Sequence, residues 1–311
     1  MRNTLFRHRG NPKGFFEGWY YRQVSGDGKT SLSLIPGYSR SKEDPHAFLQ
    51  YILDDHRGIR TGYIRYPYEA LVCEEEPFSL SIGGNRFHGG GFTVDLRDGD
   101  LGILGEVVFG PLSPIGQSLY APGIMGPFSY LPFMECNHAV ISMDHSLQGS
   151  LSLLGETVTF DGGQGYLEKD WGISFPDRYV WVQANRFTDG STFFVSVASI
   201  PLGPLSFEGF IGVFFHKGVE HRFASYLPLT SCRVRLEEKQ VVLSLKKRDL
   251  SLEVRIRLAE GGSLWSPRIG RMDEVIKEAP ATSLEMLVRK KGAEEITLRS
   301  DVAALEVVGE W

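Results

Sequence analysis

The stretch 165–187, GYLEKDWGISFPDRYVWVQANRF, constrains the fold more than any other part of the sequence. Aromatic and β-branched residues flank a centre that Gly172, Pro176 and Asp177 interrupt, so the pattern predicts two strands joined by a short turn. Successive side chains of a strand point to opposite faces. In the first strand, this alternation separates an aromatic and acidic face from a second face. The first consists of Tyr166, Glu168 and Asp170, and the second of Leu167, Lys169 and Trp171.

The second strand of this stretch has the same two-sided pattern. Val180, Val182 and Ala184 form a plain packing face. The opposite face carries Tyr179, Trp181, Gln183, Asn185 and Phe187. If the polar faces of both strands point into one cavity, that cavity has aromatic walls, two carboxylates and two amides. Such a lining suits a large, mostly apolar ligand with one polar end.

The length and composition indicate an all-β protein of two halves. A chain of 311 residues is long enough for two ordinary domains, and 36 glycines with 12% aromatic residues favour many strands and tight turns. We therefore expect two β-barrel or β-sandwich halves, at 1–164 and 165–311, with few short helices. Residues 252–258 give the clearest amphipathic strand, and residues 272–279 predict one short helix.

Charge and cysteine usage exclude several classes of protein. The sequence has 33 basic and 38 acidic residues and no long block of one sign, which argues against a nucleic-acid partner. Three widely spaced cysteines fit reduced thiols in a cytoplasmic protein better than a disulfide framework. The amino terminus lacks an apolar run of signal-peptide length, and no run is long enough to span a bilayer. These features predict a cytoplasmic location, compatible with peripheral contact at a membrane, and leave the oligomeric state undetermined.

Three further segments have a functional and a structural interpretation. The opening run 12–24 holds five aromatics around Glu17, and either forms a core strand or lines a pocket; Glu17 and Trp19 share one face and Gly18 and Tyr20 the other. The Gly- and Pro-rich residues 110–133 are a candidate cover for a cavity. His138 is either a hydrogen-bonded interior histidine or a site residue. The glycines near residues 83–91 predict hairpin turns, because they lack the pattern of a phosphate loop.

Three motifs resemble those of the tocopherol cyclase family. They are the opening FFEGWYYRQ, the central EKDWG, FP and WVQANRF, and the closing SDVAALEVVG. This family is similar to a wider lipocalin-like group that includes carotenoid hydratases. The resemblance implies a calycin-like fold of two β halves and a small hydrophobic substrate, an isoprenoid or a quinol. It implies a cyclase, an isomerase-type enzyme that needs no redox cofactor and no metal.

Closing a chromanol ring on a prenylated hydroquinone requires a proton for the alkene, stabilisation of a tertiary cation, and attack by the phenol oxygen. Burial keeps a carboxyl protonated, so Glu168 or Asp170 is the predicted acid. Aromatic faces stabilise a cation, and the predicted walls are Tyr166, Trp181 and Trp19. Gln183 and Asn185 would bind the polar head. The remaining predicted substrate contacts are Glu17, Tyr21 and His138.

Other interpretations stay open at this stage. The same parts would serve a hydratase, with water as the nucleophile, or a carrier that binds a lipid without turnover. Lys169 would neutralise one carboxylate, Asp170 would cap the turn at Gly172, and Trp171 would be core if these residues are structural.

Overall fold

The structure is a computed structural model that describes residues 14–131, 134–202 and 205–311. Almost all regular elements are β-strands, which confirms the all-β prediction. Within the described residues the helices are two short 3-10 turns, η1 (Tyr68–Ala70) and η2 (Gly126–Tyr130). None of the described helices has the length and apolarity needed to cross a bilayer. Residues 1–13, where the sequence predicts no signal peptide, lie outside the described residues.

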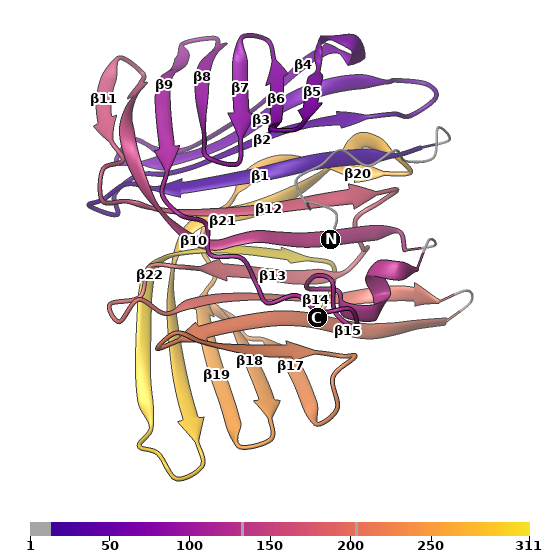
Figure 1. Cartoon of the computed structure of the whole chain (residues 1–311), viewed down its shortest axis with the longest axis vertical. Helices are drawn as coiled ribbons and strands as arrows, with labels where there is room; N and C mark the ends of the chain where they lie inside the picture. Colours follow the sequence, from indigo (N-terminus) through magenta and orange to yellow (C-terminus); the bar gives the residue numbers. More distant parts are fainter. Residues whose placement is uncertain (1–13, 132–133, 203–204) are drawn as a thin grey trace. The chain divides into compact units, whose positions relative to one another are not determined.

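The first sheet is antiparallel and has its strands in the order β4-β3-β2-β1-β12-β10-β9-β8-β7-β6-β5, with β11 paired to β10 (Figure 1). Its early strands are β1 (Phe16–Val24), β2 (Ser31–Ser39), β3 (His46–Asp55), β4 (Gly58–Pro67), β5 (Val72–Glu75) and β6 (Phe78–Ile82). The others are β7 (Asn85–His88), β8 (Gly91–Asp98), β9 (Leu101–Phe109), β10 (Cys136–Leu153), β11 (Glu156–Thr159) and β12 (Gln164–Gly172). The glycines of residues 83–91 lie in or beside the turns that join β6, β7 and β8, as predicted.

The second sheet is also antiparallel, in the order β16-β15-β14-β13-β22-β21-β19-β18-β17, with β20 paired to β21. Its first strands are β13 (Tyr179–Ala184), β14 (Thr192–Leu202), β15 (Leu205–His216), β16 (Val219–Ala224) and β17 (Thr230–Leu236). The rest are β18 (Gln240–Lys247), β19 (Leu250–Arg257), β20 (Gly262–Arg268), β21 (Arg271–Lys290) and β22 (Ile296–Val308). In both sheets the two end strands of the order are not paired with each other, so the halves resemble sandwiches more than closed barrels.

The chain divides into two compact units that are not continuous in sequence. Unit 1 contains residues 1–114, 131–175 and 263–276, and unit 2 contains residues 115–130, 176–262 and 277–311. The strands of the central stretch, β12 and β13, were predicted to adjoin as a pair. They form as predicted, but β12 pairs with β1 and β10 whereas β13 pairs with β14 and β22. The predicted boundary at 164/165 therefore falls within unit 1.

Residues 272–279, predicted as a helix, belong to strand β21. Met272, Ile276 and Glu278 are buried, whereas Asp273, Glu274 and Lys277 are exposed. The charged residues favoured a helix in the sequence, but pairing with neighbouring strands decides the conformation, because tertiary context overrides weak local propensity.

Each unit has its own apolar core. The core of unit 1 is built from β1–β3, β6–β10 and β12, and includes Trp19, Tyr21 and Leu167. The core of unit 2 includes Val180, Val182 and Ala184, as the alternation in β13 predicts. The amphipathic strand near residue 254 is β19, in which Leu252, Val254 and Ile256 are buried.

Strand β12 carries charges on both faces. On the core side, Lys169 is fully buried and its Nζ lies 2.5 Å from Oε1 of the equally buried Glu17 of β1. The hydroxyl of Tyr38 donates to the other oxygen of Glu17 at 2.5 Å. The ammonium also lies 5.0 Å from the ring centres of Trp19 and Trp171. Burial lowers the pKa of Lys169, and the adjacent Glu17 opposes that change. Lys169 thus neutralises Glu17 rather than Glu168 or Asp170.

Removing one partner of this pair should destabilise unit 1 strongly. We expect Glu17→Gln to cost about 3–5 kcal/mol of unfolding free energy, because it leaves a buried ammonium uncompensated. The double variant Glu17→Gln with Lys169→Met should recover most of that loss. Urea unfolding followed by circular dichroism measures both values.

The matched control is Asp95→Asn. It removes an exposed ion pair in which Oδ1 of Asp95 lies 3.7 Å from Nε of Arg97. It should change the unfolding free energy by less than about 1 kcal/mol, since exposed ion pairs contribute little. Equal effects of Glu17→Gln and Asp95→Asn would contradict the assigned role of the buried pair.

Candidate functional site

The face of β12 opposite the core of unit 1 carries Tyr166, Glu168 and Asp170, as the alternation predicts. We call the surface of the first sheet on this side the acid face. Strand register defines its neighbours: Asp170 lies between His138 of β10 and Gly18 of β1, and Glu168 lies between Val140 and Tyr20. The sequence gives the parity of each strand, and the register adds which residues share a face.

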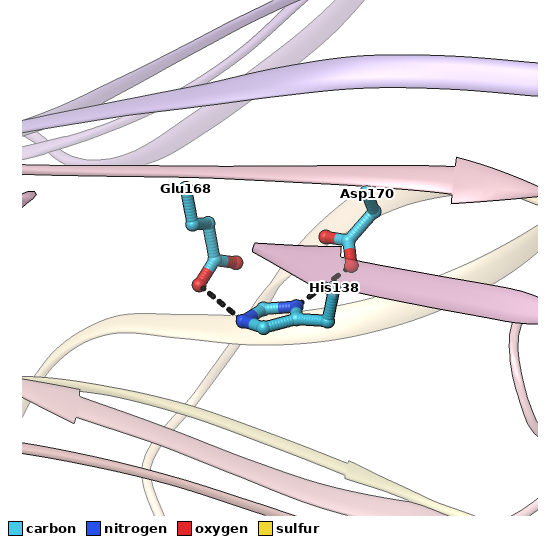
Figure 2. A group of neighbouring side chains, drawn as sticks. All are labelled: His138, Glu168 and Asp170. Carbon is cyan, nitrogen blue, oxygen red and sulfur yellow. Dashed lines mark hydrogen bonds and ion pairs between the residues drawn. The ribbon is translucent and has the colours of Figure 1, made fainter. Parts of the chain in front are cut away.

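His138 lies between the two carboxylates (Figure 2). Its Nδ1 is 2.7 Å from Oδ1 of Asp170, and its Nε2 is 3.3 Å from Oε2 of Glu168. The hydroxyl of Tyr166 donates to the same Glu168 oxygen at 2.6 Å. Because both ring nitrogens face carboxylate oxygens, the arrangement suits an imidazolium ring that donates on both sides. His138 is therefore a histidine with two acidic partners, which the sequence did not reveal.

The electrostatics of this cluster depend on burial. Burial alone would lower the pKa of His138, but Asp170 and Glu168 outweigh it and raise the pKa to about 10. Burial raises the pKa of Glu168, and the neighbouring His138 opposes the rise. Burial and the adjacent Glu168 raise the pKa of Tyr166 well above its usual range, so its phenol stays protonated and donates. The cluster therefore holds protons on buried groups at neutral pH.

The side chains of Asp170, His138 and Glu168 differ in their exposure to solvent. The side chain of Asp170 is 19% exposed, that of His138 is 12% exposed and that of Glu168 is 5% exposed. Asp170 thus stands nearest to solvent, Glu168 is the most buried, and His138 joins them. This order separates two carboxylates that the sequence could not distinguish.

The structure does not bring every predicted residue of unit 1 to this cluster. Glu17, Trp19 and Tyr21 pair in register with Trp171, Lys169 and Leu167, so they lie on the core side of the sheet. Trp19 is consequently not a wall beside Glu168 or Asp170. It packs in the core, and the interpretation of the opening aromatics as a core strand holds for Trp19 and Tyr21. Trp171 also packs against this core.

Trp181, Gln183 and Asn185 belong to unit 2. Trp181 and Gln183 lie on β13, and the ring of Trp181 packs edge to face on that of Phe194, with 6.5 Å between the ring centroids. The side chains of Trp181, Gln183 and Asn185 are all buried. Their neighbour Tyr179 donates to Glu306 of β22 at 2.6 Å. Their predicted role as a wall and as binders of a polar head stays a prediction.

Four polar residues near these faces are not among the site residues predicted from the sequence, although Tyr20 was assigned there to one face of the opening strand. Tyr20 and Arg22 of β1 lie on the acid face, opposite Glu168 and Tyr166 respectively, and the guanidinium-bearing Arg22 is 1% exposed. Glu306 pairs in register with Trp181 and Glu278, and Glu278 is fully buried. The alternation of side chains along β1 could have indicated Tyr20 and Arg22, since these residues alternate with Trp19 and Tyr21 and so share the opposite face.

The Gly- and Pro-rich segment predicted as a cover lies partly in unit 2. There Arg222 of β16 donates to the carbonyls of Gly116 at 2.6 Å and Gly123 at 3.3 Å. Tyr226 donates to the carbonyl of Ile124 at 2.9 Å. These bonds hold the segment on unit 2, and its role as a cover stays a prediction.

The cluster also has the donor types of a metal site. One ligand atom from each of His138, Glu168 and Asp170 lies within 4.8 Å of the others, and a histidine with two carboxylates is chemically able to hold a divalent cation. Both ring nitrogens already face carboxylate oxygens, however, and an imidazolium accounts for that geometry without an ion. That no metal is required stays a prediction.

Comparison with known sequences supports the resemblance noted above. The model of the family described as tocopherol cyclase-like matches residues 110–224, which include His138, Glu168 and Asp170. A rice protein (Oryza sativa subsp. japonica) named "Probable tocopherol cyclase, chloroplastic" is 32% identical over 66 residues. That match covers 21% of this chain and 14% of the rice protein. The resemblance to the tocopherol cyclase family is thus confirmed over the central part of the chain.

Solved structures share the fold over nearly the whole chain. The crystal structure of CghA has a TM-score of 0.63 at 10% identity, covering 96% of this chain and 90% of CghA. Kievitone hydratase from Nectria haematococca has a TM-score of 0.55 at 8% identity, covering 99% of this chain and 95% of the hydratase. At such identities the likeness establishes the fold alone.

The charge on His138 should make stability depend on pH. Its pKa is raised from 6.5 to about 10, so its ion pairs stabilise the fold fully below pH 6.5, and this contribution disappears as the pH rises through about 10. We expect the stability difference between the wild type and His138→Gln to shrink from pH 6 to pH 10. Urea unfolding at a series of pH values measures it, and a difference that stays constant over that range would contradict the assignment.

Proposed function

We propose that this protein is a tocopherol cyclase-like enzyme that closes a ring on a prenylated quinol, or on a related isoprenoid alkene, with Glu168 as the acid. The observation that carries the proposal is a carboxyl that is buried, has a raised pKa, accepts a hydrogen bond from Tyr166 and lies 3.3 Å from Nε2 of His138. The match of the tocopherol cyclase-like family over residues 110–224 supports the reaction class.

Glu168 meets two requirements of an acid for alkenes. Burial raises the pKa of Glu168, since the anion is poorly solvated there, and this favours the protonated form. After the proton leaves, Tyr166 and His138 stabilise the resulting carboxylate through Oε2. The environment therefore favours the protonated form before reaction and stabilises the anion that forms during it.

The reaction balances without an added reagent. The Glu168 proton bonds to one alkene carbon, and the positive charge develops at the more substituted carbon. The phenol oxygen bonds to that carbon, and the phenol proton returns to the Glu168 carboxylate. The product is an isomer of the substrate. The adjacent Tyr166 ring and the Glu168 anion lie on the same face and stabilise the cation.

His138 and Asp170 form a proton route to the buried acid. Asp170 is the more exposed carboxylate and contacts Nδ1 of His138, while Nε2 of the same ring faces Glu168. A proton taken up at Asp170 can pass through the ring to Glu168 if Glu168 loses its proton to water. Asp170 and His138 are thus positioning and proton-supplying residues in this proposal, and Glu168 is the catalytic one.

A hydratase is the second candidate, favoured by the structural likeness to a protein named kievitone hydratase. Glu168 would protonate the alkene in the same way, and water would replace the phenol as nucleophile. A carrier is the third candidate: CghA, which has the same fold, has been crystallised with Sch210972. The carrier differs from both enzymes because its Glu168 would have no chemical role.

The test is turnover of a prenylated methylhydroquinone by the wild type and by Glu168→Gln. In H2O we expect the wild type to form a chromanol with the same mass as the substrate. In D2O the chromanol should carry one deuterium on carbon. Glu168→Gln should lose at least 100-fold in kcat, because general acid catalysis contributes about 10²–10⁴-fold. Chromatography with mass detection identifies the product. A product heavier by one water would favour the hydratase.

Glu106→Gln is the matched control, because Glu106 is an exposed carboxylate on β9. It should leave kcat unchanged. Binding of the hydroquinone without turnover in both the wild type and Glu168→Gln would contradict the enzyme proposal and support the carrier.

A further inference from the structure

One cross-strand row of the acid face lacks side chains at its centre. The row contains His138 of β10, Asp170 of β12, Gly18 of β1, Gly37 of β2 and Phe48 of β3. Two adjacent positions without a side chain therefore separate the carboxylate from an aromatic ring. Side chains on adjacent strands of one face lie about 5 Å apart.

The two glycines of this row differ in what surrounds them. A Cβ at Gly37 would lie 2.5 Å from Cζ of Phe48, so the Phe48 ring already covers Gly37. At Gly18, among the described residues and apart from its chain neighbours, a Cβ would meet only Cγ2 of Ile35, at an ordinary 3.7 Å. Gly37 is explained by packing, whereas Gly18 is not.

Backbone conformation does not explain Gly18 either. Its φ is not among the positive values found at many other glycines of the chain, so any residue could adopt it. Glycine weakens a strand interior, and there it often marks a place where a ligand approaches the backbone closely. Gly18 is also the only half-buried residue of β1, which is otherwise buried throughout.

We propose that Gly18 is a specificity-determining residue that leaves room for the aromatic ring of the substrate beside Asp170. The inference rests on the proposed function and adds the position of the ring. Phe16 and Tyr20 precede and follow Gly18 on the acid face, and Phe48 lies beyond Gly37, so three aromatic side chains surround the space. The fourth side is Asp170, which accepts a hydrogen bond from a ring hydroxyl. The prenyl substituent then extends toward Glu168, the next residue of this face.

The experiment measures binding and turnover of prenylated hydroquinones that carry no, one or three ring methyl groups, with Gly18→Ala and Gly18→Val. We expect Gly18→Val to raise KM and Kd at least 10-fold for the trimethylated ring and much less for the unmethylated one. Gly18→Ala should show the same order with smaller factors. Both variants should keep the thermal midpoint of the wild type or exceed it. Tryptophan fluorescence quenching gives Kd, and chromatography gives KM and kcat.

Gly102→Val of β9 is the matched control, since the φ of Gly102 is also not positive and a Cβ there would meet no other atom of the described residues within 4 Å, its chain neighbours apart. It should leave Kd and KM unchanged. Equal binding of all hydroquinones by the wild type and Gly18→Val would overturn the inference while leaving the Glu168 result intact. If the wild type binds hydroquinones without turning them over, and Gly18→Val loses binding according to ring size, the role of Gly18 is supported and the enzyme proposal is overturned. Absence of hydroquinone binding in the wild type would overturn both.

Discussion

The burial of charges on both faces of β12 is the constraint on which the described structure depends most. Lys169 points into the core of unit 1 and requires Glu17, while Glu168 and Asp170 point the other way and require His138. Each charge is tolerable only because a neighbouring strand supplies its partner, β1 on one side and β10 on the other. The central position of β12 between these strands is thus an electrostatic requirement as well as a packing preference.

The charges on the two faces of β12 have different roles because their surroundings differ. The Glu17 and Lys169 pair is enclosed by the aromatic core, where full burial and short contacts favour a fixed register between β1 and β12. That register places Tyr20 beside Glu168 and Gly18 beside Asp170. The acid cluster is less enclosed, and its most exposed member, Asp170, gives it access to protons. A structural ion pair therefore positions a second set of groups that the proposed chemistry uses.

The sequence predicts a large part of this arrangement from local pattern alone. Alternation in the central stretch correctly assigned Tyr166, Glu168 and Asp170 to one face, and it assigned Val180, Val182 and Ala184 to a core. It could not tell which strands lie beside β12, because register and sheet order depend on contacts between distant residues. For that reason the sequence predicts Trp19 as a wall beside the carboxylates although it faces the core, and it does not reveal the two acidic partners of His138.

Register also explains why some residues beside the cluster are not recognisable from the sequence. Tyr20 and Arg22 look like ordinary members of an aromatic strand until their opposite neighbours, Glu168 and Tyr166, are known. The helix predicted at residues 272–279 was wrong because a run of exposed charged residues favours a helix when the partner strands are not known.

The irregular pairing of β10 has a consequence for how such chains can diverge. Register shifts between Val140 and Ser142, and between Ser142 and His145, interrupt the pairing of β10 with β12, and pairing with β9 begins further along, at Leu147. An inserted residue can be absorbed at these bulges, whereas one inserted between His138 and Val140 would turn the imidazole into the core. Over evolution, length changes are therefore tolerable in the middle of β10 and excluded beside its histidine.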